Sequence, residues 1–305
     1  MAIAIVALSV AACGRSAARS ASPILSSTAW PGQSASAVAA GPSGVWVADD
    51  VADTVQRIDP VTGGLESPRT LVGQGAGALV VGEGGVWVAD SVANTVSRLS
   101  PATGLLVATI PVAADPVGLA VGGGSVWVAS LASATLTRID PSTDRVLSTL
   151  AMPAGAVRVA VGAGAVWVTN STDTVTRVLV SASGSFTTAA VRVGQGPIGV
   201  AVGGGSVWVA DAGDNTVARV DPASLRLVGP PVKVGRGPVA VVVEGATVWV
   251  ADEDAGQLTR INARTGRVVG APVGLVGIPR WLSVGLGRLW AVTAGPAAVV
   301  QIRGA

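Results

Sequence analysis

Apolar residues in this chain occur in short runs separated by clusters of glycine, proline, aspartate and asparagine. The segment "GGSVWVADAGDNTVARVDP", from Gly204 to Pro222, shows the pattern, with two apolar runs of strand length on either side of a polar turn. Closely similar segments, "GGVWVADSVANTVSRLSP" and "SGVWVADDVADTVQRIDP", begin at Gly84 and Ser43. A strand–turn–strand unit that recurs in this way predicts an array of supersecondary units.

Seven tryptophans mark the period of the repeat. They are separated by 41, 40, 40, 41, 41 and 41 residues, and they are Trp46, Trp87, Trp127, Trp167, Trp208, Trp249 and Trp290. The fifth unit divides into four apolar stretches, at residues 198–202, 206–211, 216–221 and 225–234. Seven units of four short antiparallel strands predict an all-β fold, a seven-bladed β-propeller.

The two ends of the repeat array predict how the ring closes. The last unit ends at "AAVVQIRGA", where its fourth strand is missing. Residues 23–41 align with residues 145–162, which cover a fourth strand and the first strand of the next unit. We therefore expect residues 24–30 to complete the seventh blade, so that residues 23–305 form one propeller domain with no open end blade.

The N-terminal segment "MAIAIVALSVAAC" resembles a bacterial lipobox, in which a signal is cut before a cysteine that then carries lipid. It predicts a signal over residues 1–13, with cleavage before Cys13 as the lipidation site, and a flexible tether over residues 14–22. The alternatives are a plain secretory signal without lipidation, and a segment that is not a signal. The apolar run is too short to span a bilayer as a helix. We expect an extracellular or cell-envelope protein that meets the membrane only through this lipid anchor.

Composition excludes several classes of function. The chain has no histidine and one cysteine, so disulfide frameworks and sites built from histidine or several thiolates are absent. Only 12% of residues are charged, the net charge is +2, and basic residues do not cluster with aromatic ones. Nucleic acid is therefore not an expected partner.

The pattern "GPxGVAVGGGSVWVAD…NTVxRIDPxTG" resembles the YVTN-type β-propeller repeat of bacterial surface and periplasmic proteins. It is also similar to the repeats of virginiamycin B lyase and of NHL-type sensor propellers. The lyase family uses histidine and glutamate around a divalent metal. This chain has no histidine, and its four glutamates are scattered over different units, so the resemblance implies no catalytic residue.

The resemblance specifies the fold and leaves the function open. We expect a secreted or surface-anchored binding or sensor module, a non-catalytic and monomeric scaffold for an envelope protein, a peptide or a glycan. The alternative is a metal-assisted lyase or lactonase-like enzyme with a carboxylate site in the central channel. A rigid spacer is a third hypothesis.

Residues shared by the units are expected to be structural. The tryptophans predict packing between blades. A recurring arginine, ten or eleven residues after the tryptophan in six units, is expected to bridge to an aspartate or to turn carbonyls; these residues are Arg57, Arg98, Arg138, Arg177, Arg219 and Arg260.

Acidic residues gather in the loops between the second and third strands and between blades, which should share one face. They are Asp49, Asp50, Asp53, Asp90, Asp115, Asp173, Asp211, Asp214, Asp252, Glu253 and Asp254. Such side chains usually cap their own turns. A weak calcium candidate is the run Asp252, Glu253 and Asp254, because Ca²⁺ binds several oxygens. No other cofactor is expected.

One position breaks the symmetry of the repeat. Nine residues before each blade tryptophan, five units have alanine or glycine, whereas the fourth has Arg158 and the seventh has Trp281. Together with Arg280, Asp115 and Arg236 they form a candidate site at the channel mouth for a carboxylate-bearing ligand, a glycan or a peptide. The alternatives are that Trp281 plugs the channel with Arg158 paired to Asp115, or that the two exceptions have no function.

Overall fold

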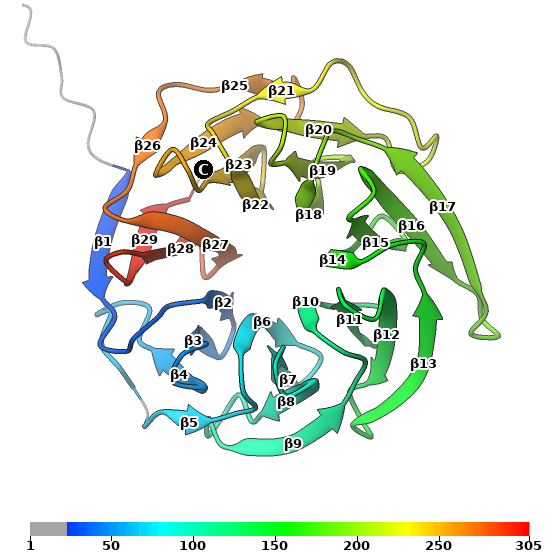
Figure 1. Cartoon of the computed structure of the whole chain (residues 1–305). Coiled ribbons are helices and arrows are strands. Elements are labelled where there is room, and N and C mark those ends of the chain that lie inside the picture. Colours follow the sequence, from blue (N-terminus) through cyan, green and yellow to red (C-terminus); the bar gives the residue numbers. More distant parts are fainter. Residues whose placement is uncertain (1–22, 67, 305) are drawn as a thin grey trace, which may run out of the picture.

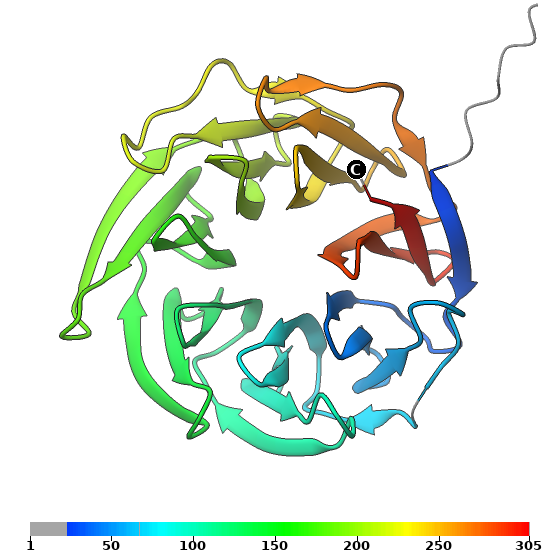
Figure 2. The same cartoon turned by 180° about the vertical axis from the view of Figure 1, so that it is seen from behind.

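The computed structural model describes residues 23–66 and 68–304 and confirms the predicted ring of seven sheets (Figure 1). Each sheet is antiparallel, and the inner strands surround a central channel (Figures 1 and 2). The strands follow the chain from the inner to the outer edge of the sheet, except in the seventh sheet, whose outer strand comes from the N-terminal end of the described chain. Among the described residues there is no helix long and apolar enough to cross a membrane.

The first four blades each hold four consecutive strands. They are β2 (Ala37–Gly41), β3 (Gly44–Asp49), β4 (Thr54–Ile58) and β5 (Thr70–Leu71); β6 (Ala76–Gly82), β7 (Gly85–Asp90), β8 (Thr95–Leu99) and β9 (Leu106–Pro111); β10 (Pro116–Val121), β11 (Val126–Ser130), β12 (Thr135–Asp140) and β13 (Arg145–Ala151); β14 (Ala156–Gly162), β15 (Ala165–Asn170), β16 (Thr174–Val180) and β17 (Phe186–Arg192).

The remaining three blades complete the circle. They are β18 (Pro197–Gly203), β19 (Ser206–Asp211), β20 (Thr216–Val220) and β21 (Val232–Lys233); β22 (Pro238–Glu244), β23 (Thr247–Asp252), β24 (Gln257–Asn262), β25 (Arg267–Val268) and β26 (Val273–Gly274); β27 (Ile278–Gly285), β28 (Arg288–Ala294), β29 (Ala298–Arg303) and β1 (Ile24–Ala29).

The ring closes as predicted, by pairing the two ends of the chain. Strand β1 is the outer strand of the seventh blade and runs antiparallel to β29, with Ala29 opposite Ala298 and Ile24 opposite Ile302. The amide of Trp30 extends the pairing with a hydrogen bond of 3.0 Å to the carbonyl of Ala297. The seventh blade therefore joins residues that are 269 to 278 positions apart in sequence.

The outer strands of three blades are shorter than the hydrophobic pattern predicted. In the fifth blade the predicted stretch 225–234 contains only β21 and an isolated bridge between Val220 and Leu227. The segment includes Pro230 and Pro231, which have no amide hydrogen to donate to a neighbouring strand. Pro68 in the first blade and Pro272 in the sixth have the same effect near β5 and β26.

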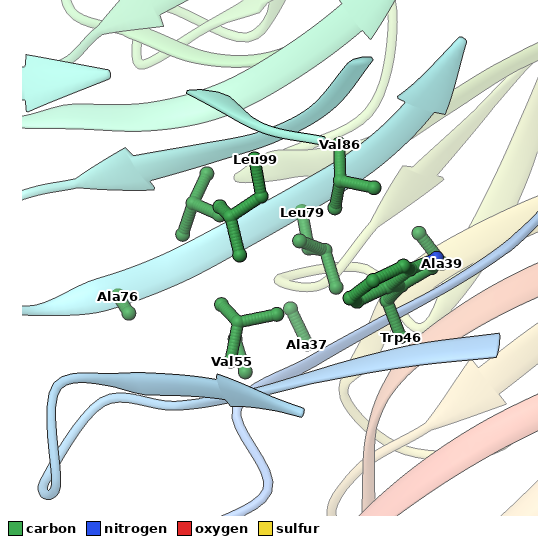
Figure 3. Packing of buried hydrophobic residues seen from close by; sticks show 10 residues of the cluster. Ala37, Ala39, Trp46, Val55, Ala76, Leu79, Val86 and Leu99 are labelled. Carbon is green, nitrogen blue, oxygen red and sulfur yellow. The ribbon is translucent and has the colours of Figure 1, made fainter. Parts of the chain in front are cut away.

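The repeated tryptophans pack between adjacent blades, which confirms their predicted role. Trp46 is 1% exposed and lies in a cluster with Val55 of its own blade and Ala76 and Leu79 of the second (Figure 3). Burying a tryptophan of about 150–250 Å² contributes at most about 4–6 kcal/mol at ~25 cal/mol per Å². These clusters therefore hold each blade to the next.

The recurring arginines have an additional role that the sequence did not reveal. In five blades the guanidinium carbon lies 5.0–6.0 Å from the ring centroid of that blade's own tryptophan. The predicted bridges are confirmed for Arg98, which pairs with Asp144 at 2.8 Å, and for Arg177 and Arg219, which donate to carbonyls at 3.1 Å. All three partners belong to the next blade, so stacking and ion pairing connect neighbours.

Candidate functional site

The loops between blades are capped by side chains at one repeated position. Asp53, Asn94, Asp173 and Asn215 each accept a hydrogen bond from an amide of the following inter-blade loop, over 2.7–3.1 Å. All four have positive φ, between 53° and 58°, which aspartate and asparagine tolerate better than most residues. These side chains therefore cap the inter-blade loop rather than their own turn. Own-turn capping, as predicted, is seen at Asp49, which accepts hydrogen bonds from the amides of Val51 and Ala52.

Four of the acidic residues that the sequence placed on this face are buried instead. Asp49, Asp90, Asp211 and Asp252 end the second strands and are fully buried, so they add no surface charge. Burial raises the pKa of Asp90 to about 6 and that of Asp211 to about 7, and it also raises the pKa of Asp252. The expected acidic face therefore carries fewer surface carboxylates than the number of acidic residues in its loops implied.

The calcium candidates have three different environments. Asp252 accepts a hydrogen bond of 2.5 Å from the hydroxyl of Thr259, and Glu253 lies 3.6 Å from Nε of Arg280. Asp254 is exposed, and its backbone carbonyl accepts a hydrogen bond from Arg236. Within residues 23–66 and 68–304, no three His, Cys, Asp or Glu side chains are placed to hold a metal ion. Calcium binding, like the metal-assisted enzyme, stays a prediction.

The two residues that break the repeat symmetry meet across the channel. The guanidinium carbon of Arg158 lies 4.7 Å from the ring centroid of Trp281. Nη1 of Arg158 donates to the carbonyl of Val117 at 2.6 Å and to that of Val157 at 3.1 Å. Trp281 also packs against core clusters of the first three blades. The pair therefore forms a partition inside the channel.

Close packing of the inner strands explains the small residues elsewhere in this ring. A Cβ added to Gly118 would lie 3.0 Å from the Cα of Arg158 and 3.1 Å from the carbonyl oxygen of Val157. Gly199 faces the same constraint from Ala240. Three other blades have alanine here, and Arg158 and Trp281 are the two long side chains at this position, both of which line the channel.

The partition separates two hollows of different character. On the side where the inner strands begin, a hollow of about 420 Å³, here called the mouth, is lined by polar and charged side chains that include Ser36, Asp50, Glu253 and Arg280. On the other side, a hollow of about 310 Å³, here called the apolar half, is lined almost entirely by aliphatic side chains. Arg158 and Trp281 line both hollows.

Three of the five predicted site residues come together at the mouth. Arg158, Trp281 and the exposed Arg280 line it, whereas Asp115 and Arg236 do not. The amide of Asp115 donates a hydrogen bond to the side-chain oxygen of Asn94, in the capped loop between the second and third blades. Among the described residues, Arg158 has no ion pair within 4.0 Å, so the pairing with Asp115 that formed part of the plug alternative is wrong.

Sequence reasoning missed other parts of the mouth. In the sequence, Asp50 and Glu253 cannot be distinguished from the other acidic loop residues. The fold brings these two together in the lining of one hollow. Ser36 gave no signal, because serine is common in loops; its hydroxyl bonds to the carbonyls of Ala48 and Ala76. The proposed lipidation site, Cys13, lies outside the described residues.

Exposed aliphatic side chains lie on the mouth side of the seventh, first, second and third blades, in loops and, for Ile278, at the first residue of β27. This aliphatic arc consists of Val276, Ile278, Val51, Val92 and Leu131, which are between 38% and 73% exposed. Val51 also lines the mouth itself. The amides of Val92 and Leu131 bond to inter-blade loops, which places their loops on the same face.

Comparisons with solved structures agree on the fold. The chain is similar to virginiamycin B lyase from Staphylococcus aureus (15% identity, TM-score 0.77, covering 91% of this chain and 98% of that one). It is also similar to hydrazine synthase of Kuenenia stuttgartiensis (13%, 0.78, 91% and 97%) and to the Pan2 WD40 domain of Neurospora crassa (13%, 0.75, 92% and 94%).

No protein-family model matches the chain, and no curated protein sequence matches it significantly. At 13–15% identity, the similar structures show the propeller architecture alone. The three are a lyase, a synthase and a WD40 domain, so the architecture carries no single activity. The YVTN assignment rests on the sequence pattern.

Proposed function

We propose that the protein is a binding module whose partner is a protein or peptide that docks over the mouth. The observation that carries this proposal is the combination of a polar mouth with the aliphatic arc beside it. Exposed aliphatic residues gathered at the rim of a hollow are typical of protein-binding surfaces. The exposed Arg280 and the carboxylates of Asp50 and Glu253 supply charged contacts of both signs.

A glycan partner is less well supported by these residues. Carbohydrate recognition commonly uses an exposed aromatic face. Among the described residues, the large hydrophobic side chains that are exposed are all aliphatic. Trp281 is only partly exposed, and Arg158 covers one face of its ring. The aliphatic arc instead matches the apolar side chains of a peptide.

The peptide-binding proposal is tested by selection from a random peptide display library. The wild-type protein is compared with a mouth variant carrying Val51→Asp and Arg280→Glu, and with a control variant carrying Val61→Asp and Arg145→Glu. Val61 and Arg145 are also exposed but do not line the mouth. Selected peptides should bind the wild type and the control with equal affinity and the mouth variant at least tenfold more weakly.

Three results would overturn the proposal. They are equal binding of the selected peptides to the mouth variant, a failure of any peptide to be enriched, and binding of envelope glycans at the mouth in a parallel glycan array. Circular dichroism of both variants verifies that the charge changes leave the fold intact.

We propose further that this module works at the outer surface of a bacterial cell, anchored through Cys13. The apolar run that ends at Cys13 supports this location. In a bacterial host the full chain should fractionate with membranes, and Cys13→Ser should release it. Membrane association that is unchanged in Cys13→Ser would contradict lipid anchoring.

A further inference from the structure

The apolar half of the channel contains one cation and no acid. The side chains that line it are mainly valine, leucine and alanine, and among the residues that the structure describes Arg158 is the only charged one in this lining. Burial lowers the pKa of Arg158 to about 10, so the guanidinium is still positively charged at neutral pH. A charge in such surroundings is costly unless a group of opposite sign compensates it.

The protein itself compensates Arg158 only in part. Nη1 donates to the two backbone carbonyls and the face of the guanidinium lies over Trp281, but in the described part of the chain no hydrogen bond is made by Nε or Nη2. A guanidinium has five N–H donors in a planar fork that matches a carboxylate. Arg158 therefore retains donors for an external anion.

We propose that the apolar half binds a monocarboxylic acid with a flexible apolar tail of medium length. The carboxylate would pair with the free donors of Arg158, and the tail would extend along the aliphatic walls toward the hairpins that join the first and second strands. Ser283, whose hydroxyl oxygen accepts the amide of Ala40 at 3.0 Å, retains its own hydroxyl proton as a second donor.

The size of the hollow sets the expected length of the ligand. At about 310 Å³ it lies at the lower end of small-molecule sites, which span about 300–1,000 Å³. At roughly 30 Å³ per water-sized group, it accommodates about ten non-hydrogen atoms. Octanoate has that number of atoms and is the natural probe.

This inference is independent of the proposed function, because the mouth and the apolar half lie on opposite sides of the partition and share only a few residues of it. Arg280 lines the mouth and is absent from the lining of the apolar half. A failure of octanoate binding would therefore leave the peptide proposal standing, and a failure of the peptide selection would leave this one standing.

The test is isothermal titration of the protein with octanoate, octanol and acetate, together with a series of shorter carboxylates. Octanoate should bind at least tenfold more tightly than octanol, acetate should show no binding, and affinity should rise about fourfold for each added methylene. Arg158→Ala should weaken octanoate binding at least tenfold, Arg158→Lys should restore part of it, and Arg280→Ala should change it less than twofold.

The substitution Arg158→Ala is compatible with the fold, since Ala37, Ala78 and Ala240 occupy the same position in other blades. Urea denaturation of each variant verifies folding before titration. The proposal is overturned if octanoate does not bind at millimolar concentration, if octanol binds equally well, or if Arg158→Ala binds octanoate like the wild type.

Discussion

The buried carboxyl of Asp211 predicts that a single hydroxyl will stabilise the protein in a pH-dependent way. In the second and sixth blades the equivalent aspartates, Asp90 and Asp252, accept hydrogen bonds from Ser97 at 2.7 Å and Thr259 at 2.5 Å. In the fifth blade the corresponding position is Ala218. Neither side-chain oxygen of Asp211 meets a donor in hydrogen-bonding geometry among the described residues.

The size of the effect follows from the pKa values. Burial, together with the charges of Asp214 and Asp173, raises the pKa of Asp211 from 3.8 to about 7. The nearby amides of Gly194 and Ala218 lower it only in part, because they do not reach hydrogen-bonding geometry. The corresponding pKa of Asp90, which has its hydroxyl partners, is about 6. One unit corresponds to about 1.4 kcal/mol. We expect Ala218→Ser to raise the free energy of unfolding by about 1 kcal/mol at pH 8.

The sign of the pH dependence is fixed by linkage. Because the folded-state pKa of Asp211 lies above its unfolded value, the folded protein binds the additional proton, and stability is lost as pH rises toward 7. A serine that lowers this pKa toward 6 adds stability as the pH rises through the window in which the two folded proteins differ in protonation, and the added stability is kept at higher pH. The pH-dependent part of the gain should therefore appear between pH 6 and 7, persist above pH 7 and be absent at pH 5.5.

Urea denaturation at pH 5.5 and pH 8 measures the gain. Asp211→Asn serves as the control, since without the titrating carboxyl the serine should confer no pH-dependent gain. A gain of equal size at both pH values, or a loss at pH 8, would refute the reasoning.

Three further predictions concern the ring. Deleting residues 23–30 removes β1 from β29, so the melting temperature should fall sharply in a thermal denaturation scan; unchanged melting would contradict ring closure by this strand. Arg98→Met removes the stacking on Trp87 and the ion pair with Asp144, and chemical denaturation should show a loss of about 2 kcal/mol; a loss below 0.5 kcal/mol would argue against it. Gly118→Val forces apart strands already 3.0 Å from the missing Cβ, at a cost of about 2 kcal/mol in the same assay, and a neutral result would disprove the close approach.

The fold was predictable because each of its signals is local and repeated seven times. The tryptophan period gives the number of blades, glycine and proline give the turns, and the missing strand at one end matches an additional strand at the other. The short outer strands were the main error, since their apolar residues suggested length while Pro230, Pro231 and Pro272 removed the amides that pairing requires.

The candidate site was predictable only where it departs from the repeat. Arg158 and Trp281 stood out as exceptions at an inner-strand position, and the structure brings them into contact. Their partners could not be identified, because contacts across the channel depend on side-chain lengths and directions that a repeat does not encode. Asp115 illustrates this limit: its loop lies nearby, yet Arg158 bonds to backbone carbonyls.

Buried polar residues were a second limit of the sequence. Asp211 and Asp50 are both carboxylates at the end of an apolar run in the sequence. In the structure Asp211 ends a strand and is fully buried, whereas Asp50 is exposed at the mouth. Only the register of the strands distinguishes them.

Hydrogen–deuterium exchange of the protein with a saturating selected peptide tests the central claim, that the mouth is the binding surface, most directly. We expect slower exchange in the loops after β3, β23 and β26, at residues 50–53, 253–256 and 275–277, and no change at the outer strands. Protection confined to the outer strands β9 and β13, or to the hairpins at the opposite end of the channel, would contradict the claim.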